Sequence, residues 1–178
     1  MKLKNRNIAI FLADLYEDLE FWYPALRMGE EGAEVTSIGP RAETYRGKRG
    51  LSARADTGIS DISPEHFSAL IIPGGYSPDH MRRSREMVEF VREMDSRGAV
   101  IAAICHGPWM LASAEVIEGR KVTSFFSIRD DLVHAGAEWI DREVVKDGNI
   151  ITSRMPGDLP PFCRAIIDAV RSGDQQKG

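Results

Sequence analysis

Three short runs, almost wholly apolar, constrain the fold of this chain more than any other feature. They are residues 7–12 (NIAIFL), Ala69–Ile72 (ALII) and Val100–Ile104 (VIAAI). Each is too short for a buried helix and is the right length for a strand. Strands that are apolar throughout are typical of parallel sheets that helices cover on both faces. The runs therefore predict an α/β fold with a mostly parallel sheet.

Segments with helical spacing alternate with these runs. The predicted helices cover residues 17–32 (with Pro24 marking a kink or a restart), 85–97, 128–135 and 159–170. Further short strands are predicted at Glu34–Gly39, 122–123, 144–145 and 149–152. A hairpin is predicted within 45–55 around the sequence GKRG, and a polar tail at 172–178. Because no linker or repeat interrupts this alternation, we expect one domain over residues 1–178, with its core at about 7–171.

Composition excludes several classes of function. The 178 residues carry a net charge of −4, which gives no basic field for nucleic acid or for an anionic membrane. The two cysteines form neither a disulfide framework nor a metal motif. The first apolar run is too short for a signal peptide. We therefore expect a cytoplasmic protein with no cofactor, no metal, no nucleic-acid partner and no membrane partner.

The third apolar run leads directly into a candidate nucleophile. Cys105 follows Val100–Ile104 and precedes Gly107, Pro108 and a helical pattern. Small residues two positions before and after a nucleophile allow a sharp strand-to-helix turn, and Ala103 and Gly107 occupy those positions. A thiol at a helix N-terminus is expected to have a lowered pKa. The alternative is a buried core cysteine, but a core cysteine needs no adjacent turn.

The carboxyl ends of parallel strands meet at one edge of a sheet, so the segments that follow the three runs are expected to lie together. One of them contains Gly74 and Gly75, whose backbone amides, with that of His106, could form an oxyanion hole. The alternative is an ordinary Pro-Gly-Gly turn. His106 adjoins the nucleophile in sequence, so its side chain is expected to point away from the thiol.

The segment after the first run is acidic, with the sequence DLYEDLE at residues 14–20. Acidic residues at a helix start are usually partners of the helix dipole. Glu17, however, is placed where it could point toward the turn at Cys105. A carboxyl group there could share a proton with the thiol or act as a general acid and base.

The motifs together resemble one family. AICHGP follows an apolar strand, PGG lies about thirty residues upstream, YEDLEFWYP follows the first strand, and GRKVTS and DDLVHAGAEW lie downstream. This combination is similar to the PfpI intracellular-protease family, in the DJ/PfpI branch of the class I glutamine-amidotransferase-like fold. The resemblance implies a flavodoxin-like three-layer sandwich with a nucleophile-elbow cysteine, Cys105, a carboxyl partner, Glu17, and the neighbouring His106. It also implies homodimers, and hexamers in some members.

In protease-like members of that family, an acid after the PGG loop reaches the histidine of the adjacent subunit. Asp79 holds that position here, where a longer glutamate often stands. The alternative is that Asp79 caps a helix. Two residues depart from the family pattern: Phe125 replaces a frequent tyrosine and removes its hydroxyl, and the bulky Trp109 suggests a narrower or more apolar pocket.

The leading functional hypothesis is a cysteine-dependent enzyme that acts on small reactive carbonyls or their protein adducts, by glyoxalase- or deglycase-type chemistry. The same residues would serve an intracellular cysteine peptidase, so the substrate is a small aldehyde or a peptide. A third hypothesis is a non-catalytic redox sensor or chaperone of the stress response. Glutamine amidotransfer would need a His-x-Glu pair after Cys105, and none follows it: the later histidine, His134, precedes Ala135-Gly136.

Overall fold

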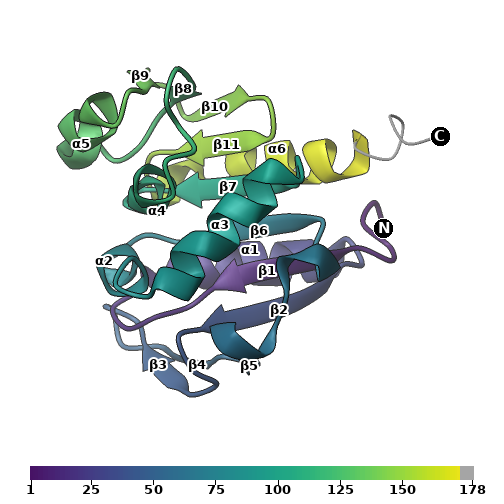
Figure 1. Ribbon diagram of the computed structural model, residues 1–178. Coiled ribbons are helices and arrows are strands. Elements are labelled where there is room, and N and C mark those ends of the chain that lie inside the picture. Colours follow the sequence, from purple (N-terminus) through teal and green to yellow (C-terminus); the bar gives the residue numbers. More distant parts are fainter. Residues whose placement is uncertain (173–178) are drawn as a thin grey trace.

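The computed structural model, which describes residues 1–172, contains a seven-stranded sheet with the order β10-β11-β7-β6-β1-β2-β5 (Figure 1). Neighbouring strands are parallel except β10 and β11. The strands are β1 Asn7–Phe11, β2 Glu34–Gly39, β5 Thr57–Gly58, β6 Ala69–Ile72, β7 Val100–Ile104, β10 Val144–Asp147 and β11 Ile150–Ser153. The strand order reverses between β1 and β6, and ligands of open α/β sheets bind at such a point.

Helices cover both faces of this sheet. They are α1 Asp18–Glu30, α2 Ser77–Met81, α3 Arg85–Ser96, α4 Pro108–Ser113, α5 Arg129–His134 and α6 Leu159–Ser172. Successive strand residues point to opposite faces, so Ile8 and Ile10 pack with α1 and α6, whereas Ala9 and Phe11 pack with α2–α5. The two cores make the predicted three-layer α/β sandwich (Figure 1).

Smaller elements extend the two ends of the sheet. Two pairs of strands lie outside the main sheet: β3 Thr44–Arg46 with β4 Ser52–Arg54, and β8 Lys121–Val122 with β9 Glu138–Trp139. Short 3-10 helices occur at Ile59–Asp61, Pro64–His66, Phe126–Ile128 and Pro156–Asp158. Within residues 1–172, the structure has no helix that is both long enough and apolar enough to span a membrane.

The sequence predicted the main elements, and the differences are local. The predicted hairpin is β3–β4, and α1 runs through Pro24 without a break. The strand expected at 122–123 pairs with β9 instead of joining the main sheet. The sequence pattern did not predict β5, β9 or α2, which have two to five residues each. Residues 173–178 of the expected polar tail lie outside the described residues.

The turn between β7 and α4 requires a glycine at position 107. A Cβ atom there would lie 2.4 Å from the carbonyl oxygen of Ile72. We expect Gly107→Ala to lower the free energy of unfolding by about 1–3 kcal/mol through overpacking. Gly29→Ala, in α1 with no atom within 4 Å of the added carbon, is the matched control and should be stabilising by up to about 1 kcal/mol. Urea titrations measure both, and equal effects would contradict this assignment.

Candidate active site

Cys105 lies in the turn between β7 and α4 with a left-handed backbone, at a φ of 63°. That conformation costs a non-glycine residue roughly 1–2 kcal/mol. Hydrogen bonds on both sides hold it in place: the Cys105 amide donates to the Ser153 carbonyl at 3.0 Å, and the Phe125 amide donates to the Cys105 carbonyl at 3.0 Å. Strain at a site held in this way is typical of functional residues.

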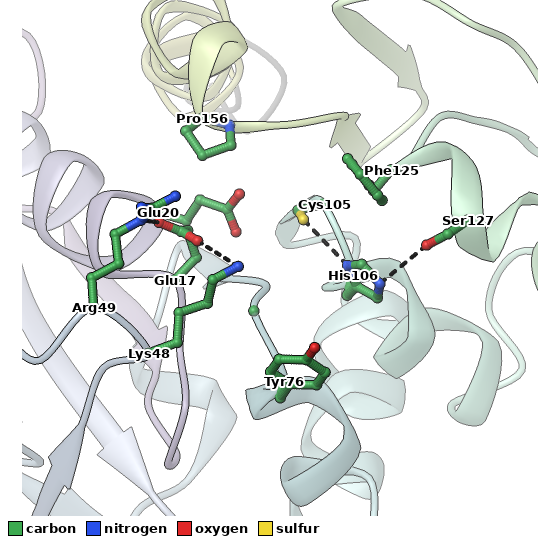
Figure 2. Close-up of a pocket in the computed structure, with 11 residues that line it drawn as sticks. Glu17, Glu20, Lys48, Arg49, Tyr76, Cys105, His106, Phe125, Ser127 and Pro156 are labelled. Carbon is green, nitrogen blue, oxygen red and sulfur yellow. Dashed lines mark hydrogen bonds and ion pairs between the residues drawn. The ribbon is translucent and has the colours of Figure 1, made fainter.

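Cys105 lines a pocket of about 440 Å³ at the carboxyl ends of the strands. Figure 2 shows Glu17, Lys48 and Arg49 on one side of the thiol, with His106 and Ser127 on the other. The remaining lining residues are Glu20, Gly75, Tyr76, Phe125 and Pro156. The structure therefore brings Cys105, Glu17, Gly75 and His106 together, as the sequence predicts.

The carboxyl group beside the thiol belongs to Glu20 and not to Glu17. Glu20 has no exposed surface, and its Oε2 accepts a hydrogen bond of 2.8 Å from the Gly74 amide. Its Oε1 is buried without a hydrogen-bond partner among residues 1–172. Glu20 and Cys105 are close enough for each to change the other's pKa. The prediction that Glu17 is the thiol's partner is therefore wrong in this structure.

The Glu17 carboxylate forms ion pairs with two cations, Lys48 and Arg49, instead of contacting the thiol. Its Oε2 contacts Lys48 Nζ at 2.9 Å, and its Oε1 contacts Arg49 Nε at 2.9 Å. Glu17 precedes the first residue of α1, whereas Glu20 lies within the first turn. Glu20, Pro24 and Met28 are four residues apart and are all buried, so Glu20 occupies the core-facing stripe of the helix. A charged residue on that stripe is the sequence signal that could have identified it.

Burial controls the protonation of this pair. It raises the pKa of Glu20 to about 8, with a further contribution from the negative charge of Glu17. Burial, followed by the negative charge of Glu20, raises the pKa of Cys105 to about 12. The expectation of a lowered thiol pKa is therefore wrong in direction. Since Glu20 keeps its proton at neutral pH, it can serve as a proton donor beside the sulfur.

Two backbone amides, from Gly75 and His106, are hydrogen-bonded to the Cys105 sulfur and favour its thiolate form. The Gly74 amide, predicted as a third member of an oxyanion hole, donates to Glu20 instead. Position 74 must be glycine, because a Cβ atom would lie 2.6 Å from Glu20 Oε2 and 2.7 Å from the Cys105 Cβ. Gly74 thus allows the carboxyl and the thiol to approach each other.

The His106 side chain points toward the thiol, which corrects the expectation that it points away. Its Nδ1 lies 3.3 Å from Cys105 Sγ, and its Nε2 lies 3.3 Å from Ser127 Oγ (Figure 2). The ring stacks on Phe125, and Trp109 packs against its edge. Burial, with the positive charge of Lys48, lowers the pKa of His106, so the imidazole is neutral at pH 7.

Two neighbours of His106, Trp109 and Ser127, lie where the sequence did not predict them. Trp109 does not line the pocket, contrary to the expectation that it narrows it, because its ring lies behind His106. Ser127 could not be predicted as a site residue because it belongs to no motif. The 3-10 helix Phe126–Ile128 places it beside His106.

Asp79 lies outside the pocket, in the first turn of α2. Its carboxylate pairs with Arg83, one turn further along the chain. The structure shows no side-chain hydrogen bond at the N-cap of α2, so the helix-cap alternative for Asp79 is not supported. Contact between Asp79 and His106 of an adjacent subunit stays a prediction.

Comparison with known proteins identifies the family. The family model described as the DJ-1/PfpI family matches residues 6–169. The chain belongs to the DJ-1/PfpI family. It is 43% identical to Deglycase PfpI of Pyrococcus furiosus over 165 residues, which cover 93% of this chain and 99% of that protein. It is 44% identical to Protein/nucleic acid deglycase 2 of Escherichia coli over 166 residues, which cover 92% of this chain and 96% of the relative.

Solved structures of the family have the same fold. DJ-1beta of Drosophila melanogaster matches with a TM-score of 0.86 and 31% identity, over 94% of each chain. A two-domain protein of Anabaena variabilis, with DJ-1/ThiJ/PfpI-like and ferritin-like domains, matches with a TM-score of 0.91 and 42% identity. That match covers 92% of this chain and 48% of the two-domain protein, so it concerns only part of the larger molecule.

Alkylation of Cys105 by iodoacetamide tests the Glu20–Cys105 pair. In the wild-type protein we expect slow labelling at neutral pH and a rise only toward the thiol pKa of about 12, because burial and the negative charge of Glu20 raise the pKa of Cys105. In Glu20→Gln that negative charge is removed, so the midpoint should move to lower pH. Glu17→Gln is the matched control and should move the midpoint less, because the Glu17 carboxylate is paired with Lys48 and Arg49. Identical midpoints in the wild type and Glu20→Gln would contradict the coupling of Glu20 to Cys105.

Proposed function

We propose that this chain is a cysteine-dependent enzyme that acts on small reactive carbonyl compounds or on their protein adducts, by glyoxalase- or deglycase-type chemistry. The observation that carries the proposal is the group around Cys105: a buried carboxyl of raised pKa, two backbone amides and a neutral imidazole. Such a site can attack a carbonyl carbon, hold the oxygen that becomes negative and move protons between them.

The first step forms a covalent adduct. The Cys105 thiol gives its proton to the neutral imidazole of His106, whose Nδ1 lies 3.3 Å from Sγ. The thiolate attacks the aldehyde carbon, a carbon–sulfur bond forms, and the carbonyl electron pair moves to the oxygen. The Gly75 and His106 amides, which point at the sulfur, are placed to stabilise that oxygen. Glu20 gives its proton to the oxygen, and the product is a hemithioacetal.

The second step moves a proton along the substrate. The Glu20 carboxylate takes the proton from the former aldehyde carbon and returns it to the adjacent carbonyl carbon. The aldehyde carbon is thereby oxidised and the neighbouring carbon reduced, so no external oxidant is needed. Water then hydrolyses the resulting thioester, and a 2-hydroxy acid leaves as its anion. His106 returns its proton to the sulfur, the water supplies the proton that Glu20 regains, and one proton is released to solvent, which restores the Cys105–Glu20 pair.

The names of two relatives support this proposal, because both proteins are called deglycases. An intracellular cysteine peptidase is the alternative that uses the same residues. A pocket of about 440 Å³ suits a small molecule better than a folded polypeptide. The proposal includes a cytoplasmic location, since a reducing compartment keeps the two free cysteines, Cys105 and Cys163, in the thiol form.

Turnover of methylglyoxal and of labelled casein on one preparation tests the reaction class. We expect the wild-type protein to consume methylglyoxal and release lactate, and we expect Cys105→Ser to lose at least about a hundredfold of that activity, since the nucleophile is removed. Cys163→Ser, which changes the other buried cysteine on α6, is the matched control and should keep its activity. Casein cleavage without methylglyoxal turnover would favour the peptidase.

Ser127 and Asp79 compete as the group that orients His106. The Ser127 hydroxyl already contacts His106 Nε2 within one chain, so we expect Ser127→Ala to lower kcat several-fold and alter its pH profile, while the melting temperature stays nearly constant. Activity that persists in Asp79→Ala, and in the monomer at high dilution, would exclude the cross-subunit role of Asp79. Loss of activity on dilution would support that role and an active homo-oligomer.

A further inference from the structure

A turn rich in cations forms one wall of the pocket, and the proposed chemistry does not use it. Residues 47–51 (GKRGL) join β3 to β4, and the first residue of α1 helps to hold their backbone. The Asp18 carboxylate accepts hydrogen bonds of 2.9 Å from the amides of Arg49 and Leu51. The Lys48 amide donates to the Tyr16 carbonyl at 2.9 Å. The turn is therefore held in place before any ligand arrives.

Lys48 and Arg49 differ in how fully their charges are compensated. Lys48 and Arg49 share a single carboxylate, that of Glu17, whose side chain is only 4% exposed. Glu20 does not compensate at neutral pH, because it keeps its proton. Asp18, which does not line the pocket, compensates Arg49 from behind the turn, so Lys48 is the cation that has only its share of Glu17. An ammonium has three N–H donors, and in the structure Glu17 accepts from one of them.

Lys48 also faces the reacting groups. Its side chain is 38% exposed and lines the pocket on the side opposite His106, with the thiol between them (Figure 2). Its positive charge lowers the pKa of both Glu20 and His106, and its own pKa is raised by Glu17 and, more weakly, by Cys105. An anion near the sulfur would therefore experience an attractive field from Lys48.

The pocket is larger than a three-carbon aldehyde requires. Its volume of about 440 Å³ equals that of roughly fifteen waters at about 30 Å³ each, whereas methylglyoxal has five heavy atoms. A substrate whose aldehyde carbon reaches Cys105 has room to extend a further group toward the cationic wall.

We propose that Lys48, assisted by Arg49, is a subsite for an anionic group of the substrate. The preferred substrates are then 2-oxoaldehydes that carry a carboxylate, in preference to neutral ones. The inference rests on the proposed function, since it names the substrate class of that same site. Lys48 here binds the non-reacting end of the substrate and takes no part in the transfer of protons.

The kinetic test compares two substrates with the same reacting groups: neutral methylglyoxal, and 4,5-dioxopentanoate, which adds a carboxylate. We expect the wild-type protein to have the higher kcat/KM for the anion. Lys48→Met should reduce the ratio of the two kcat/KM values by about tenfold, mainly through KM, as expected for one lost charge-assisted hydrogen bond. Lys48→Arg should keep part of the ratio. The control is Lys4→Met, which removes the same charge just before β1, at the amino ends of the strands and away from the pocket. It should leave the ratio unchanged. An equal loss for both substrates in Lys48→Met would overturn the inference.

A binding test separates this inference from the proposed function, because it needs no turnover. Glycolate and its neutral analogue glycolamide are compared for protection of Cys105 against iodoacetamide, which is uncharged. We expect glycolate alone to slow labelling of the wild-type protein, and we expect the effect to disappear in Lys48→Met. Equal protection by the two compounds would overturn the subsite, whether or not the protein consumes aldehydes. Protection by glycolate without any carbonyl turnover would keep the anion site and reject the glyoxalase- or deglycase-type reaction.

Discussion

The burial of Glu20 against Cys105 is the interaction on which the rest of the site depends. The Glu20 carboxyl group has no exposed surface, and burial raises its pKa to about 8 because the charged form would lose its hydration. The proton that Glu20 therefore retains makes it an acid at neutral pH. It also removes a negative charge from the neighbourhood of the sulfur, so the amides of Gly75 and His106 can favour the thiolate. Gly74 permits the contact, since any side chain there would occupy the space between the two groups.

The rest of the fold holds this unfavourable arrangement in place. Cys105 and Leu15 both have left-handed backbones, with φ values of 63° and 61°, and they lie in the turns that follow β7 and β1. Leu15 is held by hydrogen bonds with Arg46 and Tyr76, just as Cys105 is held by Ser153 and Phe125. Burying Glu20 also opposes folding as the pH rises. Its raised pKa means that the stability it contributes is fully present below the unfolded value of about 4.5 and is lost as the pH rises through about 8.

Much of the fold could be predicted from the sequence, because the apolar runs have the period and length of buried parallel strands. The turn at Cys105 could also be predicted, since Gly107 and Pro108 favour a turn that a core cysteine does not need. The helical spacing of Glu20 with Pro24 and Met28 could have indicated Glu20, but the sequence does not show that the Glu17 side chain points away from the thiol. Both residues are buried and both line the pocket. What separates them is the position of Lys48 and Arg49, and that depends on a turn that is distant in sequence and anchored to Asp18.

The orientation of His106 was unpredictable for a related reason. In an extended chain, adjacent side chains point to opposite sides, but the left-handed backbone of Cys105 changes the direction of the following residue. Ser127 then completes the contact from a segment that carries no motif. Local propensity specifies elements, whereas contacts between turns are set by the tertiary structure.

The protonation state of Glu20 at neutral pH is the central claim, and infrared difference spectroscopy tests it directly. The spectrum of the wild-type protein minus that of Glu20→Gln isolates the signal of this one carboxyl group. We predict the carbonyl stretch of a protonated acid at pH 7, which is replaced by carboxylate bands as the pH rises through about 8. Carboxylate bands already present at pH 6 would contradict the account, because a buried anion beside Cys105 could neither donate a proton to a substrate oxygen nor favour the thiolate.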